Sequence, residues 1–214
     1  FDIEAPAELV ERGRGWKRQW GARAVVLAAS TREGEEALLL DQLDALPPAA
    51  LLVIVPRHPQ RFGEVARLVE ARGIVAARRS QLGDAPPPPG VRVLVGDSLG
   101  ELYAYYAAAD IAFVGGSLAP LGGQNLIEAA SVGCPVLVGP HTYNFAAATA
   151  DAVAAGAARR VGDAREWALA CRELLADPAR RAAMAAAGVA YAQRYRGAAR
   201  RIAERIAASL WPGP

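Results

Sequence analysis

The sequence predicts an α/β fold, with a mostly parallel sheet and helices on both of its faces. Short apolar segments typical of buried strands alternate about six times with segments of helical period along the 214 residues. Apolar residues make up 53% of the chain, enough for a sizeable core even though alanine inflates this share. No uninterrupted apolar run approaches the length of a membrane span.

The first half of the chain begins with an expected helix over 7–20. Trp16 and Trp20 lie four residues apart on one face of it, where they either pack onto their own domain or contact a partner domain. Ser30 or Thr31 is expected to cap a helix that begins near Glu33. The other expected elements are strands over 23–29, 51–55, 74–77 and 91–95, a helix over 60–72 and a proline-rich loop over 83–90.

The stretch over 110–145 contains the strongest sign of a ligand site. Its expected elements are a strand over 111–114, a loop with glycine pairs at 115–116 and 122–123, a helix that starts at Gln124 and stops at Gly133, and a strand over 135–138. Glycines let a ligand approach the backbone, and a helix start offers unpaired N–H groups and a partial positive charge, which suits a phosphate.

Glu128 lies three residues after Asn125 and four after Gln124, so these three side chains are expected on one side of the first helical turns. A carboxylate at this place can accept hydrogen bonds from the hydroxyls of a sugar. A phosphate at the helix start with a ribose beside it is the layout of a nucleotide site. A tight loop with a satisfied polar cap is the simpler alternative for a glycine pair before a helix, and the added Asn125 and Glu128 favour the nucleotide site.

Arg57 and His58 directly follow the expected strand over 51–55. Ligands of open α/β sheets gather at the carboxyl ends of strands, and the planar fork of an arginine matches a phosphate or a carboxylate. A lone arginine after a strand is usually only solvated. Its histidine neighbour favours a role in binding.

The letters GDSLG around Ser98 resemble the nucleophile elbow of serine hydrolases and the motif of the GDSL esterases. Such an enzyme needs an acid and a histidine in matching order. His141 is the only histidine after Ser98, Asp110 is the only aspartate between them, and no D-x-x-H follows. Ser98 is therefore expected to cap a helix, with Glu101 completing a capping box.

The last part of the chain is expected to be mainly helical. Helices over 145–155 and 167–175 flank a short strand over 157–161, and helical spacing continues over 178–210. A stripe of apolar side chains with this spacing is expected to face the core; its members are Tyr191, Tyr195, Ile202, Ile206 and Leu210.

Charge, cysteines and missing motifs argue against several classes of protein. A net charge of +2 gives no basic surface for nucleic acid, so no nucleic-acid partner is expected. Cys134 and Cys171 are far apart, without a CxxC pair or a histidine cluster, which predicts a reduced protein with no metal site. The chain has neither G-x-G-x-x-G nor G-x-x-x-x-G-K-[ST], which disfavours dinucleotide oxidoreductases and P-loop NTPases, and no cofactor is expected.

The stretch GGSLAPLGGQNLIEAASVGCPVLVGPHTYNF resembles the signature of the bacterial 3-deoxy-D-manno-octulosonic acid (Kdo) transferases. The resemblance includes Ala29-Ser30-Thr31 with Glu33-Gly34-Glu35, Pro56-Arg57-His58 with Arg61-Phe62, and Gly96-Asp97-Ser98 with Gly100-Glu101-Leu102, and so covers nearly the whole chain in order. The chain departs from the family at Gln124, where the family has histidine, and at Arg32, where histidine is frequent. Glutamine still donates a hydrogen bond but does not titrate, which puts an acid or base role at this position in doubt.

The resemblance implies a Rossmann-like domain that is one half of a GT-B fold. Residues 1–214 would be the C-terminal, donor-nucleotide-binding domain, with 1–20 as an interdomain link and first helix and 178–214 as C-terminal helices that reach back toward the N-terminal domain. The chain begins with Phe1 and not with methionine, so we expect a fragment that lacks the N-terminal acceptor domain.

The function that the resemblance implies is transfer of Kdo from CMP-Kdo to a lipid A precursor in lipopolysaccharide biosynthesis, by inverting direct displacement. The full-length enzyme would act at the cytoplasmic face of the bacterial inner membrane, while the general base and the membrane contact belong to the missing half, so the fragment would be soluble and inactive alone. A GT-B transferase that uses a UDP-sugar and a non-catalytic nucleotide-binding module are the alternatives. The expected donor-binding residues are Ser30, Thr31, Arg57, His58, Gly100, Gly116, Ser117, Gly122, Gly123, Gln124, Asn125 and Glu128.

Overall fold

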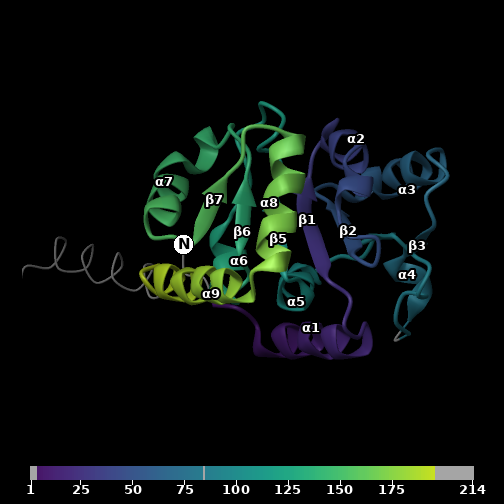
Figure 1. Ribbon diagram of the computed structural model, residues 1–214, viewed down its shortest axis with the longest axis horizontal. Helices are drawn as coiled ribbons and strands as arrows, with labels where there is room; N and C mark the ends of the chain where they lie inside the picture. The colour runs from purple at the N-terminus through teal and green to yellow at the C-terminus, as the bar shows by residue number, and fades with distance from the viewer. Residues whose placement is uncertain (1–3, 84, 196–214) are drawn as a thin grey trace, which may run out of the picture.

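The computed structural model describes residues 4–83 and 85–195 (Figure 1). Within these residues seven strands form one sheet in the order β3-β4-β2-β1-β5-β6-β7, and every neighbouring pair is parallel. The strands are β1 (Val25–Thr31), β2 (Leu51–Pro56), β3 (Ala76–Arg78), β4 (Val93–Val95), β5 (Ile111–Val114), β6 (Val136–Val138) and β7 (Ala158–Arg160). The predicted α/β class and the predicted parallel sheet are confirmed.

Helices connect successive strands and cover the sheet. They are α1 (Ala7–Gln19), α2 (Glu35–Leu40), α3 (Phe62–Glu70), α4 (Arg79–Leu82), α5 (Leu102–Ala108), α6 (Ile127–Ser131), α7 (Ala146–Ala154), α8 (Ala164–Ala176) and α9 (Pro178–Gln193). Three short 3-10 turns add η1 (Leu43–Ala45), η2 (Pro59–Arg61) and η3 (Tyr143–Phe145). No helix among the described residues is long and apolar enough to cross a membrane.

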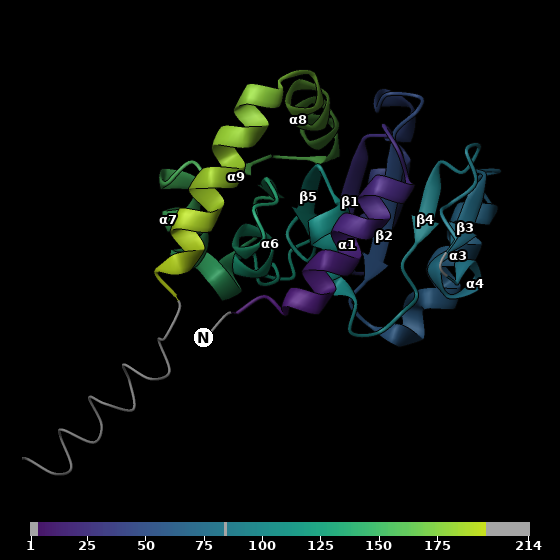
Figure 2. The ribbon, with the colours of Figure 1, turned by 90° about the horizontal axis from the view of Figure 1, so that it is seen from below.

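Two cores form because successive strand side chains point to opposite faces of the sheet. Val25 and Leu27 of β1 face a core that α1, α5 and α6 complete, whereas Val26 and Ala28 face a core that α2, α3 and α8 complete. All seven residues of β1 are buried between the two cores. Figure 2 shows α1 and α9 on the side of the sheet nearest the viewer, while α8 crosses in front of the sheet in Figure 1.

The strand order places the topological switch point between β1 and β5. Strands β2, β4 and β3 lie in this order on one side of β1, and after β4 the chain crosses to the other side of β1 at β5. Ligands of open α/β sheets bind beyond the carboxyl ends of the strands at such a point. Ser30 and Gly115 stand at these ends.

Trp16 and Trp20 pack onto their own domain. Their rings stack with centroids 5.8 Å apart, and the ring of Trp16 lies 5.2 Å from that of Tyr105 on α5. Both tryptophans are buried. The helices approach closely because Gly13 has no side chain: a Cβ there would lie 2.1 Å from the carbonyl oxygen of Ala104.

The starts of three helices differ from the prediction. The central helix α6 begins at Ile127 and not at Gln124, because the side chain of Asn125 accepts a hydrogen bond from the N–H of Ile127 and makes a turn there. Helix α2 begins after Gly34, which has a φ of 86°, so neither Ser30 nor Thr31 caps it.

Ser98 is not a helix cap either. Helix α5 begins at Leu102 without a side-chain cap, and the hydroxyl of Ser98 donates to the carboxylate of Glu101 and lies 3.0 Å from the hydroxyl of Tyr105. In the predicted C-terminal stripe Tyr191 is buried and meets Tyr195, whereas Ile202, Ile206 and Leu210 lie outside the described residues.

Candidate functional site

The backbone at the carboxyl end of β1 is distorted where it meets β5. The pairing of β1 with β2 shifts register between Ala29 and Thr31, and Ser30, with a φ of 54°, is the one non-glycine residue in the described ranges with a positive φ. Gly115 is required opposite this bend, because a Cβ there would lie 2.5 Å from the carbonyl oxygen of Ser30. Strained backbone of this kind is found at functional sites.

A pocket of about 290 Å³ opens at this point, and we call it the carboxyl-edge pocket. Side chains from the ends of β1 and β2, from the start of α5, from the loop and helix after β5, and from η3 line it: Ser30, Arg57, Leu102, Gln124, Asn125, Glu128 and Phe145. Five of the twelve residues that the sequence predicted are thus brought together although they are up to 98 positions apart, from 30 to 128.

Hydrogen bonds join the polar side chains of the carboxyl-edge pocket in pairs. The Nε of Arg57 donates to the Oε1 of Gln124 at 3.2 Å, and the Nδ2 of Asn125 donates to the Oε1 of Glu128 at 3.3 Å. Arg57 itself is exposed. Its two terminal nitrogens make no hydrogen bond to any of the described residues, so they can face a ligand from the mouth of the pocket.

Glu128 is half-buried, and its environment sets its charge. Burial raises the pKa of the Glu128 carboxyl, while the hydrogen bond from Asn125 and the positive charge of Arg57 lower it. A carboxylate that already receives one hydrogen bond still has lone pairs for the hydroxyls of a ligand. The carboxyl-edge pocket therefore offers a cation for an anionic group and an acceptor for hydroxyl groups.

The other seven predicted residues do not line the carboxyl-edge pocket. Thr31 is buried and its hydroxyl donates to Glu36, whereas His58 and Gly100 are exposed beside the pocket. Gly122 packs under η3, where a Cβ would lie 2.2 Å from the side chain of Asn144. Gly123 uses its N–H to reach the carbonyl of Gly116 at 2.7 Å.

The first turn of the loop after β5 does not offer free N–H groups to a phosphate. Those of Gly116 and Ser117 donate to the carboxylate of Glu35 at 2.6 and 3.0 Å. The hydroxyl of Ser117 is also committed, since it donates to the carbonyl of Val114 and accepts from the N–H of Gly139. Helix α6 has five residues and begins four positions after Gly123, so the helix does not directly follow the glycine pair as expected.

Three residues at or behind the carboxyl-edge pocket were not among the binding residues predicted from the sequence. Leu102 and Phe145 provide apolar walls of the carboxyl-edge pocket, and Glu35 holds the loop behind it. All three belong to the motifs that carry the family resemblance, so motif membership was the available signal. Nothing in hydrophobic periodicity distinguishes them from ordinary helix residues.

The environment of Ser98 contradicts a hydrolase. Its hydroxyl is bonded to a carboxylate and a phenol, Glu101 and Tyr105, instead of to a histidine. Among the described residues no group of three or more His, Cys, Asp or Glu side chains is arranged to hold a metal ion.

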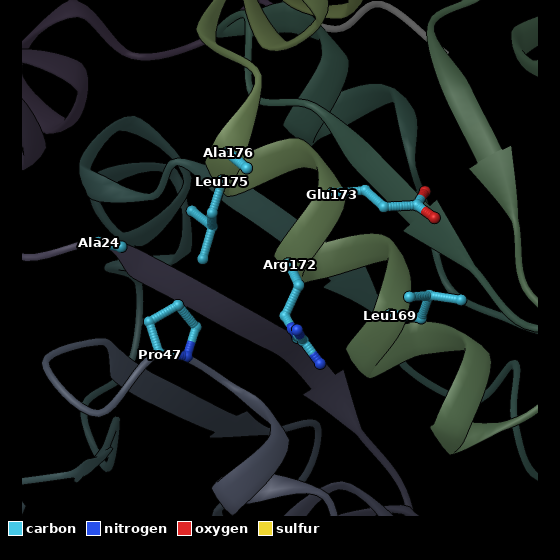
Figure 3. A pocket seen from close by; sticks show the side chains of 7 residues that line it. All are labelled: Ala24, Pro47, Leu169, Arg172, Glu173, Leu175 and Ala176. Atoms are coloured by element: carbon cyan, nitrogen blue, oxygen red, sulfur yellow. The ribbon is translucent and has the colours of Figure 1, made fainter.

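A larger pocket of about 560 Å³ lies at the amino ends of the strands, on the edge of the sheet opposite to the switch point (Figure 3). Ala24, before β1, and Pro47, before β2, form one wall, and α8 forms the other. In Figure 3 the side chain of Glu173 points away from Ala24 and Pro47, and Glu173 pairs with Arg159. The lining of this larger pocket is mainly apolar, and none of the predicted residues is part of it. The size of a pocket alone therefore does not identify the ligand site.

Solved structures share this fold. The crystal structure of the C-terminal CMP-Kdo binding domain of WaaA from Acinetobacter baumannii matches with a TM-score of 0.80 and 29% identity, covering 88% of this chain and 100% of that one. Anabaena Alr3699/HepE, solved with UDP and glucose, matches with a TM-score of 0.65 over 97% of this chain and 55% of that one; at 18% identity it shows the fold alone. The fold and the position of the pocket define a Rossmann-like half of a GT-B glycosyltransferase.

The chain belongs to the glycosyl transferases group 1 family, whose model matches residues 81–190. It is also similar to the 3-deoxy-D-manno-octulosonic acid transferase of Bordetella pertussis, with 49% identity over 215 residues that cover 96% of this chain and 49% of that protein. The chain therefore spans about half the length of this relative.

Proposed function

We propose that this chain is the donor-binding domain of an enzyme that transfers Kdo from CMP-Kdo to a lipid A precursor in lipopolysaccharide biosynthesis. The proposal rests mainly on one observation: Arg57 and Glu128 line one pocket at the switch point of a domain that shares 49% identity with a Kdo transferase. The similar domain from Acinetobacter baumannii, described as CMP-Kdo binding, supports the choice of donor.

The chemistry of the carboxyl-edge pocket fits a nucleoside monophosphate. Arg57 supplies a guanidinium for the single phosphate, and the carboxylate of Glu128 accepts hydrogen bonds from the ribose hydroxyls. Leu102 and Phe145 supply apolar surface for the flat faces of a base. A pocket of about 290 Å³ holds part of the donor, and the sugar extends beyond its mouth.

In the proposed reaction a hydroxyl oxygen of the acceptor attacks the anomeric carbon of Kdo as the bond from that carbon to the phosphate oxygen of CMP breaks. CMP leaves with the electron pair, and the configuration at the anomeric carbon is inverted because the acceptor attacks from the face opposite to CMP. Arg57 offsets the negative charge that develops on the departing phosphate. Gln124, which accepts a hydrogen bond from Arg57, fixes the orientation of the guanidinium.

The acceptor hydroxyl must lose a proton, and the carboxyl-edge pocket assigns no base to it. Gln124 does not titrate, and Glu128 is committed to the nucleotide. We propose that the base, the binding site for the lipid acceptor and the contact with the cytoplasmic face of the inner membrane belong to the N-terminal half of the full-length enzyme. The 214-residue chain would then bind the donor without transferring Kdo.

The proposal is tested by incubating the full-length protein and, separately, this chain with CMP-Kdo and a lipid A precursor, and following the product by mass spectrometry. The full-length protein is expected to add Kdo and release CMP, while the chain alone forms no product. Transfer from a UDP-sugar but not from CMP-Kdo would overturn the proposed donor. Transfer of Kdo by the chain alone would overturn the assignment of the base to the other half.

A further inference from the structure

We propose that Glu35 is a positioning residue for the nucleotide: its carboxylate fills, as an internal anion, a nest of backbone N–H groups formed by residues 116–119 and so holds one wall of the carboxyl-edge pocket in place. This inference rests on the proposed function for the identity of the nucleotide. The geometry of the nest is independent of that function.

The carboxylate of Glu35 accepts five backbone hydrogen bonds. Its Oε1 accepts from the N–H groups of Ser117, Leu118 and Ala119 at 3.0, 2.9 and 3.4 Å. Its Oε2 accepts from those of Gly116 and Arg32 at 2.6 and 2.9 Å. The side chain is fully buried, with 0% of its surface exposed.

Four consecutive N–H groups that converge on one point form a nest, which is a binding site for an anion. Buried N–H groups without acceptors are costly, so the loop needs hydrogen-bond acceptors at this point. In this chain a glutamate of α2 supplies it from within the fold. The nest is consequently closed to a phosphate.

The nest is directly connected to the wall of the carboxyl-edge pocket. The carbonyl of Gly116 accepts from the N–H of Gly123 at 2.7 Å, and Gly123 immediately precedes Gln124. A Cβ on Gly116 would lie 3.4 Å from the Nε2 of Gln124, so this side chain rests against the loop. Gln124 in turn accepts the hydrogen bond of Arg57. Glu35 therefore determines where Gln124 and Arg57 stand.

A buried carboxylate could instead serve stability alone, and Glu36 provides the matched control. It is the next residue of the same helix and is also 0% exposed. Its oxygens, however, accept from the guanidinium of Arg61 at 2.7 and 3.1 Å and from the hydroxyl of Thr31 at 2.6 Å. None of these partners belongs to the loop over 116–119.

Glu35→Gln is a sharp test because the amide is isosteric with the carboxylate but one of its two ends cannot accept. In one orientation the NH₂ group meets three backbone donors, and in the other it meets two. The loop must shift in either case. Glu36→Gln also replaces an acceptor by a donor, but the hydrogen bonds that it disturbs are those from Arg61 and Thr31.

The experiment compares the full-length protein with its Glu35→Gln and Glu36→Gln variants, below the melting temperature of each. CMP affinity is measured by calorimetry, and amide hydrogen exchange is followed over 116–124. We expect Glu35→Gln to weaken CMP binding at least tenfold and to speed exchange both at 116–119 and at the amide of Gly123. Glu36→Gln is expected to weaken CMP binding less than threefold, whatever its effect on melting temperature.

A folded Glu35→Gln variant that binds CMP within twofold of the wild type would overturn the proposal, as would an equal loss in Glu36→Gln. If Glu35→Gln does not fold, Glu35→Asp decides: it keeps the charge but is one methylene shorter, so a three- to tenfold loss is expected and unchanged affinity overturns the proposal. A wild type that does not bind CMP would overturn the proposed function only. The exchange experiment needs no ligand, and faster exchange at 116–119 without any change at Gly123 would contradict the positioning role.

Discussion

At the scale of single residues, the proposed nucleotide site depends on two opposite charges at the carboxyl-edge pocket. Arg57 is exposed on the turn after β2, whereas Glu128 is half-buried at the start of α6. An exposed cation and a partly desolvated carboxylate can divide a nucleotide between them, with the phosphate on one and the ribose on the other. Each of these two binding roles predicts an effect on nucleotide affinity that a purely stabilising role would not produce.

Glu128→Gln keeps the shape and one acceptor oxygen but loses the charge. We expect it to weaken CMP binding by about tenfold, in line with the ~1.5 kcal/mol of a hydrogen bond to a charged group. Binding of 2′-deoxy-CMP should fall much less, because one ribose hydroxyl is already missing. Calorimetry on the two proteins with the two nucleotides completes the cycle, and equal losses for both nucleotides would show that Glu128 does not contact the 2′-hydroxyl.

The pKa of Glu128 predicts how binding depends on pH. Burial raises this pKa above the ordinary 4.5, so the free protein takes up a proton at higher pH than an ordinary glutamate. The ionised form accepts the ribose hydroxyls, and CMP affinity should therefore fall as the pH falls through the raised pKa. Dissociation constants between pH 7.5 and 5 test this effect.

The phosphate of CMP also titrates, near pH 6, and Glu128→Gln is the control for it. The variant should retain only the pH dependence that comes from the phosphate. Its CMP affinity should therefore change less with pH than that of the wild type. Parallel curves would mean that Glu128 binds no group of the nucleotide in its ionised form.

Arg57→Ala should lower donor affinity by about ten- to a hundredfold, the effect of losing a hydrogen bond of roughly 1.5–3 kcal/mol to an ionic ligand. The domain should remain folded, because Arg57 is exposed and its side chain donates one hydrogen bond, to Gln124, within the described residues. Arg67→Ala, at an exposed position of α3, is the matched loss of one positive charge. The KM for CMP-Kdo in the full-length enzyme measures the effect; an equal change in both variants would indicate only long-range electrostatics.

At the scale of elements, the close contact of α1 with α5 makes the first helix an integral part of this domain. Gly13 lies where a Cβ would meet the carbonyl oxygen of Ala104 at 2.1 Å, whereas a Cβ on Gly15 of the same helix meets only the end of the Arg18 side chain at 3.8 Å. The two glycines therefore respond oppositely to the same substitution.

Gly15→Ala should stabilise the domain by about 0.5–1 kcal/mol, since alanine is the better helix former. Gly13→Ala should instead destabilise it by about 1–3 kcal/mol, because the added methyl group forces α1 away from α5. Urea denaturation of both variants tests the pair. If Gly13→Ala is as stable as Gly15→Ala, α1 does not depend on this contact.

The strands were predictable from the sequence, and the start of the central helix was not. Apolar runs such as 111–114 and 51–55 are long enough to mark buried strands without any tertiary information. The start of α6 is set by the side chain of Asn125 and by glycines whose neighbours, such as Asn144, come from a distant turn. Periodicity cannot detect such contacts, so the predicted helix began three residues too early.

Part of the candidate site was likewise predictable from the sequence, and part was not. Ser30, Arg57, Gln124, Asn125 and Glu128 could be selected because polar residues after strands meet at one edge of a parallel sheet. The hydrogen bonds from the Gly116 and Ser117 amides to Glu35 could not be predicted from the sequence, because they join positions more than 80 residues apart through backbone groups. Glycine-rich loops alone do not reveal whether their N–H groups are free.

At the scale of the whole molecule, the parallel sheet and its switch point bring the ends of β1, β2 and β5 to one edge, and the candidate site lies there. The chain spans about half of the Kdo transferase it resembles. Our central claim is that this half binds the nucleotide of the donor, and that it prefers cytidine monophosphate.

Calorimetric titration of this chain with CMP, UMP and UDP tests that claim most directly. We predict that CMP binds more tightly than UDP, because the carboxyl-edge pocket provides Arg57 for one phosphate and the nest that could take another anion is filled by Glu35. We also expect CMP to bind more tightly than UMP, since the similar domain from Acinetobacter baumannii is described as CMP-Kdo binding. Glu128→Gln is expected to reduce the CMP signal in the same titration. Tighter binding of UDP than of CMP, or no binding of CMP by the folded chain, would contradict the account.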